Sequence, residues 1–202
     1  PPLKSMDALP NNLPVQTTPL IGREKELKSI KELFTKKDCR LVSLVGPGGM
    51  GKTRLSLQVA ADLLDENRDG TWFIDLSAVT QPQGVALETA KVLSLLQEPE
   101  VDPVELVAKA LEDRKILIIL DNFEQVTEAY TVVVTWLRRS PGARFIITSR
   151  EPLNIRGEHA FHVPPLSLPK PGTGAILSQF EATRLFIDRA CAGKPDFQVN
   201  ND

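Results

Sequence analysis

A phosphate-binding loop constrains this chain more than any other feature of its sequence. Residues 46–53, Gly-Pro-Gly-Gly-Met-Gly-Lys-Thr, satisfy the pattern G-x-x-x-x-G-K-[ST] at every fixed position. The apolar run 40–45 before the loop is typical of a buried parallel strand, and apolar residues at helical spacing follow over 53–64. The glycines let successive N–H groups point at an anion, and the start of the helix adds its positive end. A strand–loop–helix unit that binds nucleotide phosphates is therefore predicted.

Two side chains of this loop are candidates for contact with the phosphates and their metal ion. We expect Lys52 to reach the β- and γ-phosphates and the Thr53 hydroxyl to bind Mg²⁺. The next residue, Arg54, faces either the solvent or the nucleotide. The expected cofactors are ATP or ADP with Mg²⁺, and the loop residues expected to contact them are Gly46, Pro47, Gly48, Gly49, Met50, Gly51, Lys52, Thr53 and Arg54.

The bulk composition argues against several kinds of partner. Of the 202 residues, 42% are hydrophobic and 25% are charged, which is ordinary for a soluble globular domain. The net charge of −2 provides no overall attraction to nucleic acid or to an anionic membrane, and no apolar run approaches bilayer length. Cys39 and Cys191 are too few and too far apart for a disulfide framework. We therefore expect a cytoplasmic segment that contacts neither membrane nor nucleic acid directly.

Apolar runs and helical periodicities alternate along most of the chain. Beyond the loop unit, they predict strands near 71–76, 115–121, 144–150 and 159–163, and helices near 22–34, 83–97, 103–113, 126–139 and 180–190. This alternation favours an α/β fold, a mostly parallel sheet with helices on both faces. In such sheets the ligand lies beyond the carboxyl ends of the strands, so the polar residues that end each strand are informative.

Asp121 ends an uninterrupted apolar strand, a pattern typical of the Walker B motif. A carboxylate at this position would bind Mg²⁺ through water and help to fix the ion near Thr53. The alternative is that Asp121 caps the helix that follows.

The residue after this acid is Asn122. Many hydrolysing P-loop enzymes have a carboxylate there that polarises the attacking water. An amide cannot accept a proton, so we expect slow turnover. Glu124 lies close by in sequence and is either a catalytic carboxylate or a solvated acid at a helix start.

Arg150 ends the strand predicted before Glu151. Its guanidinium offers a fork of donors to phosphate oxygens, so it could contact the γ-phosphate and sense its loss. The alternative is an ion pair with Glu151. Lys52, Asp121 and Arg150 are accordingly the candidate catalytic residues, and Thr53 and Asp121 are the candidate metal ligands.

A short segment before the first predicted helix is the candidate contact for the base. Ile21 could pack on the face of the adenine ring, and Gly22 would let the backbone approach it. Arg23 follows directly and is counted with them. The alternative is an ordinary helix start.

Six segments of the chain carry a likeness to a known protein family: PLIGREKEL, LVSLVGPGGMGKTRLSLQVAADLL, GTWFIDLSAV, ILIILDNFEQV, FIITSREPLNIRGEHAFHVPPL and EATRLFIDRA. Together they resemble the nucleotide-binding domain of STAND ATPases, which are signal-transduction NTPases related to the NB-ARC domain. The likeness covers residues 11–196. It is greatest to bacterial versions found in large transcriptional regulators and beside class III nucleotide cyclase domains. LDNFEQV and TSREPL together are more specific than the two Walker motifs.

The resemblance implies a P-loop NTPase three-layer sandwich with a five-stranded, mostly parallel sheet. In it, the sensor strand separates the Walker A strand from the Walker B strand. The resemblance also implies a switch, in which ADP holds a closed, silent state and ATP permits opening and self-association. Three parts of the chain are expected: a linker from a preceding domain over 1–20, the P-loop domain over 21–192, and the start of a connection over 193–202. This connection is expected to lead to helical and winged-helix subdomains and then to sensor repeats of the same polypeptide.

The resulting hypothesis is an ATP- or ADP-binding signalling switch of a bacterial multidomain regulator, with slow Mg²⁺-dependent hydrolysis. Two alternatives stay open. One is an autonomous P-loop enzyme such as a small-molecule kinase, and the other is an interaction scaffold that keeps its nucleotide for structural stability. Stoichiometric ADP that survives purification without measurable turnover would favour the scaffold.

Overall fold

The centre of the molecule is a five-stranded sheet whose neighbouring strands all run parallel. The computed structural model describes residues 9–97, 100–169 and 179–194. The strands are β1 (Leu41–Val45), β2 (Thr71–Asp75), β3 (Leu117–Asp121), β4 (Arg144–Ser149) and β5 (Glu158–His162), in the order β2-β3-β4-β1-β5. β4 thus separates the Walker A strand β1 from the Walker B strand β3, which confirms the expected α/β fold and strand arrangement.

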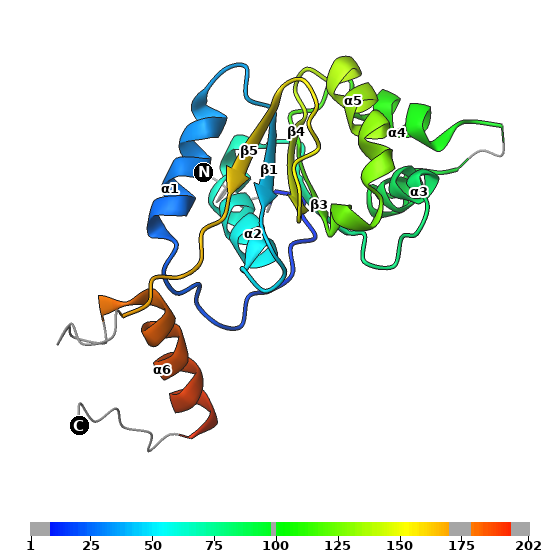
Figure 1. Ribbon diagram of the computed structural model, residues 1–202. Coiled ribbons are helices and arrows are strands. Elements are labelled where there is room, and N and C mark those ends of the chain that lie inside the picture. Colours follow the sequence, from blue (N-terminus) through cyan, green and yellow to red (C-terminus); the bar gives the residue numbers. More distant parts are fainter. Residues whose placement is uncertain (1–8, 98–99, 170–178, 195–202) are drawn as a thin grey trace, which may run out of the picture.

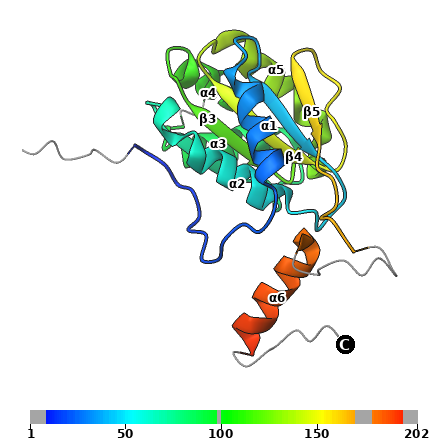
Figure 2. The same cartoon turned by 90° about the vertical axis from the view of Figure 1, so that its left-hand side faces the viewer.

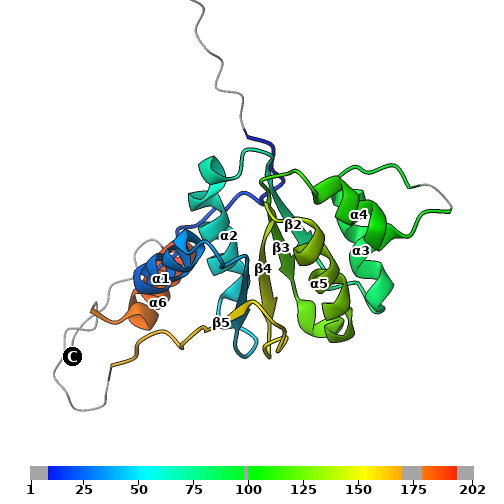
Figure 3. The ribbon, with the colours of Figure 1, turned by 90° about the horizontal axis from the view of Figure 1, so that it is seen from above.

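Helices form a layer on each face of this sheet (Figure 1). The α-helices of the described residues are α1 (Glu24–Thr35), α2 (Lys52–Asp62), α3 (Pro82–Val92), α4 (Pro103–Leu111), α5 (Tyr130–Arg139) and α6 (Glu181–Gly193). Figure 3 shows α1 and α2 on one face and α3, α4 and α5 on the other. α6 lies apart from the sheet and extends away from the region where α1 begins (Figure 2).

Each face of the sheet has its own apolar core. On the side of α1 and α2, Ile30 and Leu55 are fully buried together. On the other side, the ring of Trp136 stacks on that of Phe145 with centroids 6.2 Å apart. Because helices cover both faces, every residue of β1 and β3 is buried, which explains why these strands are mostly apolar and do not alternate strictly.

The helix expected over 126–139 begins later than predicted. α5 starts at Tyr130, after two 3₁₀ turns at Phe123–Gln125 and Thr127–Ala129. Asn122, directly after β3, takes a left-handed conformation with φ 61° and starts these turns. The chain therefore turns sharply at the end of β3 before the helix forms.

Part of the expected linker lies along the edge of β2. Asn11 forms an isolated parallel bridge with Thr71. The side chain of Asn12 accepts a hydrogen bond from the Phe73 backbone N–H at 2.6 Å and donates one to the Phe73 carbonyl at 2.8 Å. An amide side chain thus pairs with this edge as a neighbouring strand would.

The expected domain boundaries at residues 20 and 192 stay predictions. Linker residues 1–8 and connection residues 195–202 lie outside the described residues. Across 9–97, 100–169 and 179–194, we find no helix with the length and apolarity that a membrane crossing requires.

Candidate nucleotide-binding site

The phosphate-binding loop joins the carboxyl end of β1 to α2, which starts at Lys52. Gly49 and Gly51 have φ angles of 79° and 80°, in the left-handed region that residues with a side chain rarely adopt. Gly51 is also the N-cap of α2, and no side chain caps this helix end. The first N–H groups of α2 are therefore directed towards the loop, where they can donate to an anion.

Lys52 is folded back over the loop. Its Nζ donates to the carbonyl oxygens of Gly46 at 2.7 Å and Pro47 at 3.0 Å, and the residue is 8% exposed. Two carbonyl dipoles compensate a full positive charge incompletely, so the buried ammonium favours an anionic ligand. This is the position that the sequence pattern predicts for a phosphate-binding lysine.

Asp121 lies at the centre of a cluster of polar side chains beside the loop. Its carboxylate accepts hydrogen bonds from the Thr53 hydroxyl at 2.9 and 3.0 Å and from the Thr148 hydroxyl at 2.6 Å, and the residue is 3% exposed. Burial raises the pKa of Asp121, the two hydroxyls lower it, and the nearby charges of Asp75 and Glu124 raise it further. With burial dominant, the net shift is upward.

These oxygen atoms fit a magnesium ion. Mg²⁺ prefers hard oxygen ligands and binds one or two carboxylates together with water and substrate phosphates. The two predicted metal ligands, Thr53 and Asp121, lie together at the mouth of the loop. Thr148 was assigned no role from the sequence, although it lies near the end of β4, where polar residues were expected to matter.

Asn122 is tied to the same cluster. Its side-chain amide donates to Asp75 at 3.1 Å and to Asp121 at 3.2 Å, and its backbone N–H donates to the Thr148 hydroxyl at 3.0 Å. Burial raises the pKa of Asp75, but hydrogen bonds from Ser77 and Asn122 outweigh it, so the net shift is downward. Asp75 is absent from the predicted site, although it ends β2 and the strand-end argument points to it.

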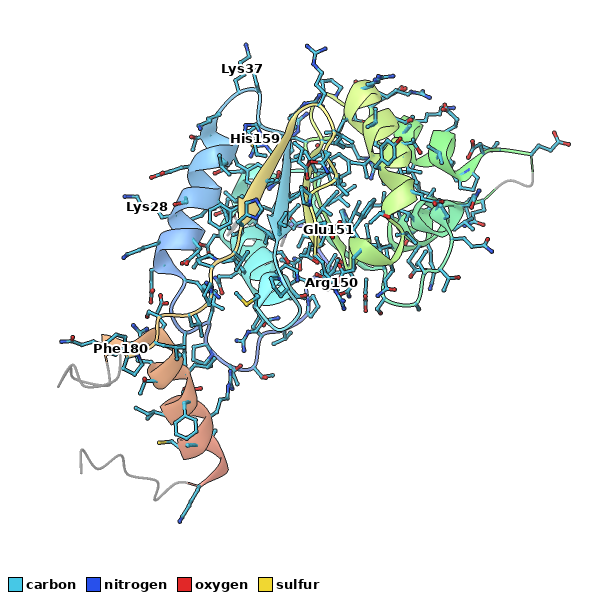
Figure 4. The ribbon with its side chains drawn as sticks, in the orientation of Figure 1. Lys28, Lys37, Arg150, Glu151, His159 and Phe180 are labelled. Atoms are coloured by element: carbon cyan, nitrogen blue, oxygen red, sulfur yellow. The ribbon has the colours of Figure 1, made fainter. Side chains whose placement is uncertain are left out.

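Arg150 forms an ion pair, but its partner is Glu124 and not Glu151. The Nε of Arg150 lies 3.3 Å from the Glu124 carboxylate, and the Arg150 side chain is 66% exposed. Figure 4 shows Arg150 and Glu151 following the end of β4, at the edge of the sheet where the strands end. The 3₁₀ turn after β3 carries Glu124 to this edge, which the sequence did not reveal.

A cavity of about 350 Å³ adjoins the phosphate loop. Loop residues Gly49–Gly51 form one side of it, and Ile21 from the segment before α1 forms another. Leu166, after β5, and Leu185, on α6, add apolar surface. An apolar pocket beside a phosphate site suits a flat base. Leu166 and Leu185 were not predicted, because only the fold brings them to the loop.

Arg23 is buried beside this cavity, with 4% of the residue exposed. Its guanidinium donates to the carbonyl of Pro164 at 2.6 Å and to the carbonyl of Met50 at 3.1 Å. It therefore joins the phosphate loop to the segment that follows β5. A Cβ added at Gly22 would lie 3.0 Å from the side chain of Glu181, so α6 approaches this turn closely.

Arg54 fastens the segment before α1 to α2. Its guanidinium donates to the carbonyl oxygens of Thr18 at 2.6 Å and Pro19 at 3.0 Å. It also lines the cavity beside the loop. The sequence left two orientations open for Arg54, towards the solvent or towards the nucleotide. In the structure, Arg54 lies at the side of the candidate base pocket.

Two mycobacterial proteins are similar to most of this chain. An uncharacterized protein of Mycobacterium tuberculosis is 34% identical over 186 residues, which are 92% of this chain and 44% of the relative. A candidate HTH-type transcriptional regulator of the same organism is 36% identical over 163 residues, which are 80% of this chain and 17% of the relative. The chain thus spans less than half the length of these relatives.

Solved structures share the fold at low sequence identity. The ORC1 protein of Aeropyrum pernix, solved in complex with DNA, matches 83% of this chain and 50% of its own with a TM-score of 0.58 and 17% identity. Cdc6p of Pyrobaculum aerophilum matches 93% of this chain and 52% of its own with a TM-score of 0.57 and 15% identity. Such likeness supports the P-loop NTPase fold alone.

A family match covers the segment that contains the phosphate loop and the acid that ends β3. The chain matches the NB-ARC domain over residues 23–162, which include the loop, Asp121 and Arg150. The chain therefore belongs to the NB-ARC domain family.

Proposed function

We propose that the chain is an ATP- or ADP-binding module of the STAND type, which acts as a nucleotide-dependent signalling switch and hydrolyses ATP slowly with Mg²⁺. The observation that carries the proposal is the meeting of Thr53 and Asp121 at 2.9 Å, next to the loop that holds Lys52. Membership of the NB-ARC family supports a nucleotide-binding P-loop module.

Each residue has a defined role in this proposal. Lys52 binds the β- and γ-phosphates, and Arg150 contacts the γ-phosphate. Thr53 and Asp121 hold Mg²⁺, which neutralises charge on the phosphates. The base lies in the cavity beside Ile21, where apolar walls exclude water from one of its faces.

A switch needs contacts that one nucleotide makes and the other does not. The side chain of Arg150 is 66% exposed, so it can turn from Glu124 towards a γ-phosphate, which ADP lacks. Asn122 stands where a hydrolytic acid is common, and this supports slow hydrolysis. Slow hydrolysis would let the ATP state persist long enough to transmit a signal.

The module would act within a larger protein, since it covers 44% and 17% of its two mycobacterial relatives. We propose a bacterial, cytoplasmic regulator whose helical, winged-helix and sensor-repeat domains are the partners of this module, with ATP-dependent self-association. The relative described as an HTH-type transcriptional regulator supports transcription as the output. A neighbouring class III nucleotide cyclase domain stays a prediction from the sequence resemblance.

The test is titration of the nucleotide-free chain with ATP and ADP, with and without Mg²⁺, together with a phosphate-release assay. Binding of both nucleotides, strengthened by Mg²⁺ and followed by slow turnover, supports the proposal. Stoichiometric ADP that survives purification without turnover would favour the scaffold. Fast turnover would favour an autonomous enzyme, and absence of binding would overturn the proposal.

A further inference from the structure

The hydrolytic site has no acid directly after Asp121, because Asn122 occupies that position. The Asn122 side-chain amide uses its N–H groups within the protein, since it donates to Asp75 at 3.1 Å and to Asp121 at 3.2 Å. It therefore orients the carboxylate that is expected to hold the metal. If the chain hydrolyses ATP, another group must accept a proton from the attacking water.

Glu124 has a carboxylate oxygen suited to this task. Its side chain is 18% exposed, and its Oε1 accepts a hydrogen bond from the Arg150 Nε at 3.3 Å. Its Oε2 is buried and receives no hydrogen bond from the described residues. A buried acceptor without a donor is unfavourable, so this oxygen has a strong preference for a water molecule.

The backbone holds Glu124 at this edge of the sheet. Asn122 turns the chain with a φ of 61°, and the fully buried ring of Phe123 anchors the 3₁₀ turn that follows. Glu124 is the next residue of that turn and meets Arg150 directly beyond β4. Two segments at the carboxyl edge of the sheet therefore hold the Glu124 carboxylate near the polar cluster around Asp121.

Other carboxylates at this edge are less suited. Asp121 accepts hydrogen bonds on both of its oxygens, from Thr53, Thr148 and Asn122. Asp75 accepts from the backbone of Ser77 at 2.8 Å as well as from Asn122. Both oxygens of Asp121 therefore already have donors, and Asp75 is an exposed residue.

We propose that Glu124 is the catalytic carboxylate that orients and deprotonates the attacking water, and that Arg150 restrains it until a γ-phosphate draws the guanidinium away. The inference rests on the proposed function. In the step, the water oxygen bonds to the γ-phosphorus and the bond to the β–γ bridging oxygen breaks. Its electron pair stays on ADP, the water proton passes to the Glu124 Oε2, and the products are ADP and phosphate.

The ion pair would make hydrolysis depend on the γ-phosphate. With ADP bound, or with no nucleotide, Arg150 stays on Glu124 and neutralises its charge. With ATP bound, phosphate oxygens offer the guanidinium a bidentate partner, and the Glu124 carboxylate is released from the ion pair. The same arginine then stabilises the phosphate and releases the base.

The experiment compares Glu124→Gln with Glu151→Gln, a matched control at the neighbouring exposed acid, in phosphate-release and calorimetric assays. We expect Glu124→Gln to lower turnover by about 100-fold, as loss of a general base does. The affinities for ADP and for a non-hydrolysable ATP analogue should stay within about twofold of the wild type. Glu151→Gln should leave turnover and affinity unchanged.

Four outcomes would overturn the inference. One is unchanged turnover in Glu124→Gln, and a second is a parallel loss of turnover and nucleotide affinity, which indicates a binding role. A loss of turnover in Asp75→Asn with none in Glu124→Gln would assign the water to Asp75 instead. ATP binding without any turnover by the wild type also contradicts a catalytic Glu124, but leaves nucleotide binding intact. Failure of the wild type to bind ATP is a different result, because it removes the proposed function itself.

Discussion

Asp121 is hydrogen-bonded to polar side chains from several segments of the candidate site. It accepts hydrogen bonds from Thr53 of the phosphate loop, from Thr148 of β4 and from Asn122. Burial raises the pKa of this carboxyl group, which means that the protein alone compensates its charge poorly. A magnesium ion at this place would supply the missing compensation and link Asp121 to the phosphates.

Arg150 should distinguish ATP from ADP. We expect Arg150→Ala to weaken binding of a non-hydrolysable ATP analogue by about tenfold, or about 1.4 kcal/mol, and to leave ADP binding within about twofold. The reason is that its proposed contact exists only when the γ-phosphate is present. Calorimetric titration with both nucleotides provides the measurement, with the exposed Arg156→Ala as the control. Equal losses for the two nucleotides, or no loss for either, would reduce Arg150 to an ion-pair partner of Glu124.

A site residue could be predicted from the sequence where it belongs to a short sequence motif, and not where only the fold brings it to the site. Lys52, Thr53 and Asp121 stand in short motifs, so their positions could be named from neighbouring residues. Asp75 is absent from the predicted site, because its contact with this cluster follows from the strand register that pairs it with Asp121. The alternative considered for Arg150, an ion pair with Glu151, names the wrong acid, because Glu124 comes from another segment and only the fold brings it to Arg150.

At the scale of the elements, buried strands were predicted more closely than helix ends. The strand expected over 115–121 is β3, at Leu117–Asp121, because a continuous apolar run marks it. The helix expected over 83–97 ends at Val92. Ser94 then takes a left-handed φ of 55°, and apolar periodicity contains no information about such a turn.

The turn into β2 should be sensitive to substitution at Gly70. Its φ is 112°, and an added Cβ would lie 2.7 Å from the carbonyl oxygen of Pro10. We expect Gly70→Ala to lower the free energy of unfolding by about 2–4 kcal/mol, because backbone strain and a steric clash add together. Urea unfolding gives the measurement.

Gly157→Ala is the matched control for this prediction. Gly157 has a φ of 88°, but an added Cβ would meet nothing within 4 Å. Strain alone should therefore lower its free energy of unfolding by about 1–2 kcal/mol. Equal destabilisation by the two variants would show that the segment at Pro10 does not pack against β2 in solution.

At the scale of the whole molecule, the strand order and the base pocket come from long-range arrangement. Alternating strands and helices predicted the fold class, but the placement of β4 between β1 and β3 was an implication of the family resemblance. Leu185 of α6 and Ile21 meet at the cavity although they are far apart in the chain. No local pattern contains such a contact, so the pocket could be predicted only in part.

Hydrolysis by this chain should be far slower than a typical enzyme turnover of about 10 per second. Asn122 stands where many hydrolysing P-loop enzymes have a carboxylate and cannot accept a proton, so the base must come from Glu124 in the 3₁₀ turn that follows. A steady-state phosphate-release assay with saturating ATP and Mg²⁺ checks this expectation. Several turnovers per second would show that Glu124 or another base is well placed for hydrolysis, and would favour an autonomous enzyme.

Nucleotide phosphates should bind in the loop around Lys52, and the decisive measurement is calorimetric titration of Lys52→Ala with ATP and ADP. We expect at least about tenfold weaker binding of both nucleotides, while the free energy of unfolding stays close to that of the wild type. Lys91→Ala, at an exposed lysine of α3, is the control and should bind as the wild type does. Unchanged affinity in a folded Lys52→Ala variant would show that the phosphates do not bind at Lys52.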